Sequence, residues 1–325
     1  MSTLTVPSPR PRPARWVFRL HRWALYVWAA LVLTASALLL WAAGPLADRA
    51  TRGWHRMLEC PRQGPCSVDV GFYYTVFDLL SYAMIILPFL VAAWAAVALT
   101  APGTESGSAP SAWLQGITPA RWLTARLALP AAVITAGTTL LVILHRYAGA
   151  APEDRRGPGP EWWMPRAFYT NGPALAAACL TALAAGALTG LLVRRTLPSL
   201  GITLAATTLL FTGVHRLMPH LWPLVTKVND FQHGYAVRPG ALEVVHGIAT
   251  RGGGRVPAPE CTVDSAKALA ACERLYARHG GTGYFTQYHP ASHYWPLQLT
   301  TTALLLLLTA LLTAATFAVL RRRTG

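Results

Sequence analysis

The chain has 325 residues, of which 53% are hydrophobic and only 13% are charged, and its formal net charge is +15. Ordinary soluble domains carry about a quarter charged residues, so this composition favours a membrane protein. The basic excess does not indicate a nucleic-acid partner, because no interleaving of aromatic and basic residues accompanies it. Arginines that flank membrane spans and contact anionic membrane lipids explain the charge.

The apolar residues come in blocks of roughly 18 or more with almost no charge, which is the pattern of transmembrane helices. We expect six spans, at 23–46, 73–99, 123–145, 173–193, 197–217 and 297–320. The first block is too long for the apolar core of a signal peptide, and further spans follow it, so we expect it to be retained. The predicted fold is an all-α polytopic membrane protein.

The arginines give this chain an orientation. Five of them precede the first span and three follow the last, so the positive-inside rule places both termini in the cytoplasm. The predicted organisation is a basic N-terminal segment (1–22), spans one to five (23–217) with a cytoplasmic bridge (100–122), an external cap loop (218–296), and span six with a basic tail (297–325). The preference for Arg over Lys and the abundant Ala are typical of a GC-rich bacterial genome, so we expect the spans to lie in a bacterial plasma membrane.

Four of the five cysteines fall in predicted external loops, in two close pairs. We expect disulfides Cys60–Cys66 and Cys261–Cys272, with free thiols or other pairings as alternatives. Neither pair has the C-x-x-C spacing of a zinc site. His289 and His293 are four residues apart, but Pro290 disfavours a shared helical face. No metal site is expected.

The external segment is long for a loop and should carry structure of its own. Within it, "DSAKALAACERLYARHGG" predicts a helix that begins after Asp264 as N-cap and ends before Gly280. A Cys261–Cys272 bridge would tie this helix to the preceding chain. We interpret the segment as a small external cap and not as an independent domain.

Motifs of catalysis are missing from the sequence. Neither lysine, Lys227 or Lys267, lies in a G-x-x-x-x-G-K-[ST] loop, so the chain is no P-loop ATPase. No H-E-x-x-H or G-x-S-x-G motif occurs, and no cofactor is expected. The ionisable residues of the spans, among them Asp78 and His145, lie near outer ends and could reach the interface. A polytopic protein with so little chemistry should take its energy from a partner on its cytoplasmic face.

The candidate docking surface is the bridge, "TESGSAPSAWLQGITPARW" (104–122). Ser108 or Ser111 can cap a short helix over "SAWLQ", and Thr118-Pro119 can begin span three. Trp113 could anchor a partner. Alternatively, Trp113 and Trp122 could belong to an aromatic belt at the membrane interface.

Here the chain resembles a family. The blocks "LSYAMIILPFLVAAW", "TES" and "AWLQGITPARWLTARLAL" resemble the second span and following loop of ATP-binding-cassette transporter permeases of the exporter-like, type-two class. The residues that fall on the family's loop positions are Glu105, Trp113, Gln115, Arg121, Trp122 and Arg126. Residues 171–206 and "YHPASHYWPLQL" resemble its fourth and fifth spans and the element before its last span. Thr104 departs from the usual Arg, and His293 and Tyr294 depart from the usual basic residue and Phe.

This resemblance implies a permease subunit that couples ATP hydrolysis by a separate ATPase subunit to export of a substrate. It implies a coupling loop around Glu105 and Trp113, a second permease copy, identical or different, and an amphipathic helix before span one. Small residues of span four, such as Gly186 and Gly190, would permit close helix packing. Two alternatives remain: a secondary transporter that depends on Asp78, or a sensor or assembly factor that uses the disulfide-stapled external loop.

Overall fold

The computed structural model describes residues 13–59, 71–100, 118–150, 161–193, 195–234, 237–262 and 265–324. The chain divides into two compact units: a helical unit (1–159, 169–211 and 304–325) and a sheet unit (160–168 and 212–303). Within the described residues, six helices are long and apolar enough to cross a membrane: Arg22–Arg56, Gly71–Ala98, Pro119–Gly149, Ala174–Val193, Thr196–His220 and Ala291–Arg323. The six predicted spans are confirmed.

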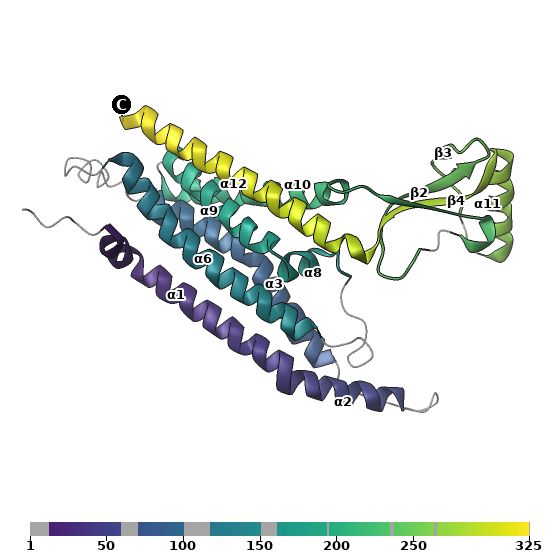
Figure 1. Cartoon of the computed structure of the whole chain (residues 1–325), viewed down its shortest axis with the longest axis horizontal. Coiled ribbons are helices and arrows are strands. Elements are labelled where there is room, and N and C mark those ends of the chain that lie inside the picture. The colour runs from purple at the N-terminus through teal and green to yellow at the C-terminus, as the bar shows by residue number, and fades with distance from the viewer. Residues whose placement is uncertain are drawn as a thin grey trace, which may run out of the picture. The chain divides into compact units, whose positions relative to one another are not determined.

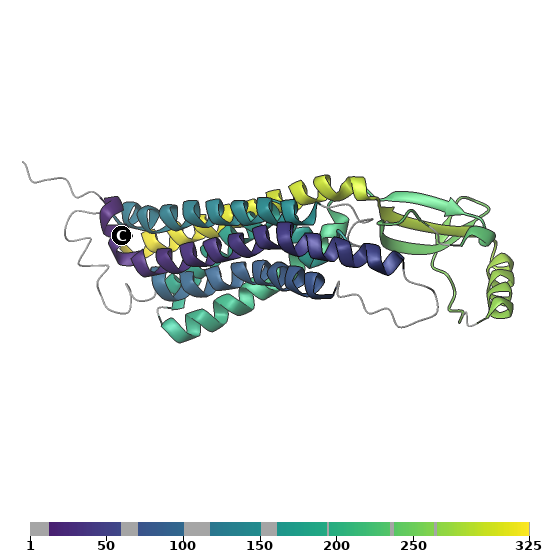
Figure 2. The ribbon, with the colours of Figure 1, turned by 90° about the horizontal axis from the view of Figure 1, so that it is seen from below.

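The helical unit is a bundle whose long helices lie side by side, as both whole-chain views show (Figures 1 and 2). Its helices are α1 (Pro13–Trp41), α2 (Ala47–Leu58), α3 (Gly71–Trp94), α6 (Pro119–Gly149), α9 (Ala174–Val193), most of α10 (Thr196–Leu217) and the C-terminal part of α12 (Tyr294–Thr324). The basic N-terminal segment from Pro13 onward and the first span form one continuous helix, α1.

The first span runs further than the sequence predicts. Pro45 lies in a π-helical turn, Ala42–Leu46, and the helix continues beyond it as α2. A wide turn can accommodate the missing N–H of proline without ending the helix. The predicted end at residue 46 is therefore short by about three turns, and α2 carries exposed charged residues, including Arg49 and Arg52.

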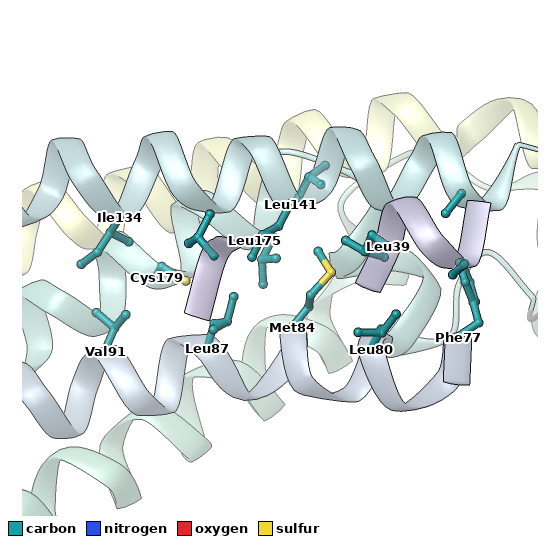
Figure 3. Close-up of a cluster of buried hydrophobic side chains, with 14 of the residues drawn as sticks. Leu39, Phe77, Leu80, Met84, Leu87, Val91, Ile134, Leu141, Leu175 and Cys179 are labelled. Atoms are coloured by element: carbon teal, nitrogen blue, oxygen red, sulfur yellow. The ribbon is translucent and has the colours of Figure 1, made fainter. Parts of the chain in front are cut away.

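The core of the bundle is built on one face of α3. Leu80, Met84, Leu87 and Val91 recur at helical spacing and are all buried. Figure 3 shows these side chains pointing toward α6, which contributes Ile134 and Leu141, and toward α9 and α1. Apolar residues at this spacing fill the space between helices from four different parts of the chain.

Small residues bring α3 and α9 into close contact. A Cβ atom added to Gly186 would lie 2.6 Å from Ala95 Cβ and 2.8 Å from the Ala92 carbonyl oxygen. No other residue type fits at this spacing, because real Cβ atoms do not approach other atoms so closely. The prediction that small residues of span four permit close packing is confirmed at Gly186.

The sheet unit shows that the all-α prediction was wrong. It holds a four-stranded antiparallel sheet in the order β1-β4-β2-β3. The strands are β1 (Val225–Asn229), β2 (Leu242–Thr250), β3 (Arg255–Val256) and β4 (Gly281–His289). Their β-branched and aromatic residues suit a half-buried sheet. The segment expected as a loop is the main part of this unit.

One helix, α11 (Ala266–Arg278), covers part of the sheet and lies across the strand direction (Figures 1 and 2). Cys272 and Tyr276 of α11 pack against Ile248 and Tyr284 of the sheet. The N-cap of α11 is Ser265, whose hydroxyl accepts from the Ala268 N–H, and not the predicted Asp264. A disulfide joins Cys261 to Cys272, with their Cα atoms 5.8 Å apart.

Candidate functional site at the end of the helical unit

The site begins where α6 follows the bridge. Thr118 is the N-cap of α6, with extended backbone, and its hydroxyl accepts a hydrogen bond from the Arg121 N–H. Pro119 occupies the first helical position, where its missing N–H leaves no bond unmade. The predicted start of this helix at Thr118-Pro119 is confirmed. Arg121, the next candidate residue, is exposed.

Trp122 turns into the bundle and is only 4% exposed. It forms a cluster with Leu123 of α6, Leu191 at the end of α9 and Leu320 at the end of α12. The side chain is therefore not an exposed aromatic of an interface belt. Instead, it joins three helix ends that the sequence separates by about 70 to 200 residues.

Arg126 lies one helical turn beyond Trp122 and is also buried, at 7% exposed. Its guanidinium carbon is 4.4 Å from the centre of the Trp122 ring. A cation over an aromatic face is attracted by the negative potential of that face, more strongly when water is excluded. This contact holds a charged residue within the bundle and fixes the orientation of the Trp122 indole.

Arg323, at the end of α12, connects two of the same helix ends by hydrogen bonds. Its guanidinium donates to the carbonyl oxygens of Leu191 and Leu192 in the last turn of α9, the second bond at 3.5 Å. Those carbonyls have no partner within α9, and the negative end of the helix dipole favours a cation there. The C-terminal turns of α9 and α12 are thus held together next to the start of α6.

A second polar cluster lies at the opposite end of α6. His145 is 1% exposed, and its two ring nitrogens lie 2.9 Å from Ser81 Oγ and 2.9 Å from Asn171 Oδ1. Arg146 donates to the Asn171 carbonyl oxygen at 2.8 Å. The expectation that His145 reaches the interface was wrong, because the bundle buries it with polar partners. This cluster joins α3, α6 and the 3-10 turn at Tyr169–Asn171.

Several candidate residues cannot be placed. Glu105, Trp113 and Gln115, together with Cys60 and Cys66, lie outside the described residues. Among the residues that the structure does describe, no group of three or more His, Cys, Asp or Glu side chains could hold a metal ion. The Trp122 cluster, as far as its residues are described, consists of Trp122 with leucines from three helices.

Comparison of the sequence with models of protein families identifies the family of the chain. Residues 29–219 match the model of a family described as ABC-2 membrane transporter related. The chain belongs to the ABC-2 membrane transporter related family. The comparisons with curated proteins and with solved structures give no match.

Family membership and six apolar helices make the chain a multi-pass membrane protein of the permease type. The match covers most of span one, spans two to four, the bridge and nearly all of span five, and thus includes Trp122, Arg126 and Leu191. It ends at residue 219, before the first strand of the sheet unit. The sheet therefore lies outside the residues that match the family model.

Proposed function

We propose that the chain is the membrane-spanning subunit of an ABC exporter, and that a separate ATPase subunit docks on the bridge. The observation that carries this proposal is the Trp122 cluster. Thr118 is the first residue of the bridge that follows the undescribed residues 101–117, and Trp122, the last residue of the bridge, lies one turn further along α6. A displacement of the bridge would reach α9 and α12 through Leu191 and Leu320, because a packed cluster transmits strain.

The exposure of the residues around the start of α6 also supports one surface for binding the ATPase and a separate buried cluster for transmitting its motion. Arg121, near the C-terminal end of the bridge, is exposed, whereas Trp122 at that end and Arg126 one turn further along α6 are buried. Glu105 and Trp113 would bind the ATPase, and Trp122 would pass the motion to the spans. The basic ends of the chain would face the cytoplasm of a bacterial cell, with the sheet unit outside.

The transporter would work as a pair of permease chains, identical or different, with two ATPase chains. A substrate would then pass along the interface between the permeases by alternating access. The disulfide of the sheet unit is consistent with an oxidising compartment on the outer side.

Co-purification from native membranes in mild detergent tests the proposal, with mass spectrometry of the bound chains and an ATP hydrolysis assay. We expect a cassette ATPase to copurify, and Glu105→Ala with Trp113→Ala to abolish its association. Trp222→Ala, at a 39% exposed tryptophan of the sheet unit, is the control and should leave association intact. Recovery of intact membrane complexes without any ATPase would overturn the proposal.

A further inference from the structure

The sheet unit contains a cavity of about 510 Å³ beside α11. The helix α11 covers Ile248 and Tyr284 of the sheet. It leaves His246 exposed, although His246 lies on the same face of β2 as Ile248. The cavity lies at this uncovered part of the sheet. The lining residues come from the turn after β1, from β2 and β4, from the segment before α11 and from α11 itself. A volume of this size falls within the range of about 300–1,000 Å³ that is usual for small-molecule sites.

Aromatic side chains form the floor of this cavity. The ring centres of Phe231 and Tyr284 are 5.2 Å apart, and those of Tyr276 and Tyr284 are 6.1 Å apart, both pairs nearly perpendicular. Tyr276 and Tyr284 are buried, so the floor is part of the core of the unit and cannot easily collapse into the cavity. Packed rings give an apolar platform with defined orientation.

The wall after β1 is preorganised by hydrogen bonds. Asp230 Oδ1 accepts from the His233 backbone N–H at 2.9 Å and lies 2.5 Å from His233 Nδ1. Asn229 donates to the Gly234 carbonyl oxygen at 2.9 Å. Gly234 has φ 57° and ψ −155°, a conformation that only glycine adopts readily. With Nδ1 held by the carboxylate, His233 presents Nε2 for another partner.

The opposite wall is fixed covalently. The Cys261–Cys272 disulfide fastens the segment before α11 to the helix. Tyr276 donates its hydroxyl proton to the Pro259 carbonyl oxygen at 3.3 Å, which holds the same segment a second time. Both sides of the cavity therefore keep their positions without a ligand, which lowers the entropic cost of binding one.

The polar side-chain groups of the lining are the Gln232 amide, the imidazoles of His233 and His246, and the hydroxyls of Tyr276 and Tyr284. No Asp, Glu, Lys or Arg is among the described lining residues. Such a lining offers neutral hydrogen-bond donors and acceptors above an apolar aromatic floor. It suits a ligand that combines an apolar ring face with several hydroxyl groups, since the Asp230 carboxylate in the wall after β1 is already bonded to His233.

We propose that this cavity binds a sugar ring of a neutral saccharide. One face of the sugar ring packs against Phe231, which is partly exposed and which Tyr284 contacts edge to face, and the sugar hydroxyls bond to Gln232, His233 and His246. This site is separate from the Trp122 cluster and does not rest on the ATPase-coupled function. It gives the four-stranded sheet and α11, which lie outside the family match, a recognition role of their own.

Saturation-transfer NMR on the full chain in lipid nanodiscs tests the proposal, with maltose and chitobiose as probes. We expect transfer to the ring protons of at least one of the two. His246→Ala should weaken that binding by about tenfold, the loss of one good hydrogen bond. His279→Ala removes an exposed histidine outside the lining and should leave binding within about twofold.

A variant that fills the cavity distinguishes binding within the cavity from nonspecific contact of the saccharide with the protein surface. Leu269→Trp enlarges a lining residue that is 39% exposed, so the fold should tolerate the change, and binding should be lost. Ala271→Trp places the same side chain at an exposed position of α11 outside the lining and should bind normally. Absence of transfer from both saccharides, equal binding by Leu269→Trp, or binding of a tryptophan-containing peptide in their place would overturn the proposal.

Discussion

The guanidinium of Arg126 lies over the ring of Trp122, with 4.4 Å between the guanidinium carbon and the ring centre. Both side chains are buried on the first turns of α6, where the bridge ends. A buried cation is costly in an apolar environment unless a partner compensates its charge. The aromatic face therefore has two tasks: it fills the junction of three helix ends and it helps to accommodate the arginine.

Replacement of Trp122 should weaken this junction strongly. Trp122→Ala leaves a cavity against Leu191 and Leu320, with an expected cost of about 3–5 kcal/mol in unfolding free energy. Trp122→Phe keeps an aromatic face for Arg126 and should cost less. Thermal unfolding in nanodiscs measures both, and Trp23→Ala, at a tryptophan that is 71% exposed, is the control. Equal melting temperatures for Trp122→Ala and Trp23→Ala would contradict the role of the cluster.

Gly186 and Gly201 should respond in opposite directions to the same substitution. A Cβ at Gly186 would collide with Ala95, so Gly186→Ala should destabilise the bundle by about 1–3 kcal/mol. A Cβ at Gly201, within α10, meets nothing within 4 Å. Gly201→Ala should therefore be neutral or stabilise by about 0.4–1 kcal/mol, because it reduces the freedom of the unfolded chain. Thermal unfolding of the two variants in parallel measures both changes in stability.

The spans could be predicted from the sequence because each is a continuous apolar block, and membrane insertion depends on that property. The end of the first span could not, since it depends on how the turn around Pro45 absorbs the proline. Trp122 could be recognised as a site residue, but not its burial. That burial depends on Leu191 and Leu320, which meet it only when the ends of α9 and α12 come together.

The sheet was missed for a different reason. β2 contains Leu242, Val244, His246 and Ile248 at alternate positions, which is a strand signal. This alternation of apolar and polar residues is short, and the segment around it is rich in Gly and Pro. The sequence therefore favours a loop for this segment. The cavity could not be predicted either, because His246 and Phe231 become neighbours only through strand pairing and the turn after β1.

Arg323 should hold the last turns of α9 and α12 in register. Arg323→Ala removes the bonds to the Leu191 and Leu192 carbonyls, and because this arginine is exposed we expect a loss of about 1 kcal/mol or less. The loss of local stability at the two helix ends should exceed the loss in overall unfolding free energy. Amide hydrogens near both ends should therefore exchange faster. Hydrogen exchange with mass spectrometry measures it. Arg322→Ala, at an exposed neighbour, should show no such change.

The Cys261–Cys272 bridge should stabilise the sheet unit. The two residues are 11 apart in sequence, and closing a loop of that length contributes about 3 kcal/mol in the chain-entropy model. Cys272→Ser should therefore lower the melting temperature of the unit, and dithiothreitol should lower it in the native protein but not further in the variant. Cys179, the buried thiol of α9, should be unaffected by the reductant. An unchanged melting profile under reduction would contradict the prediction.

Acidic pH should also destabilise the sheet unit, through His289. Burial lowers the pKa of His289, against the opposing effect of its hydrogen bond to the Pro219 carbonyl oxygen, and the nearby His293 and His220 lower it further. The folded pKa thus lies below the unfolded value of 6.5, so the unfolded state takes up a proton first as the pH falls. The stabilisation is complete above about pH 6.5 and is lost as the pH falls through the folded pKa.

Thermal unfolding between pH 7.5 and pH 5 measures this dependence. His289→Gln removes the titrating group and should flatten the pH profile, although its melting temperature at pH 7.5 should be lower because the bond to Pro219 is altered. His279→Gln, at an exposed position, should keep the native pH profile. The slope, and not the absolute melting temperature, is the decisive quantity, since only the slope reports proton uptake on unfolding. A native slope in His289→Gln would assign the acid sensitivity to another group.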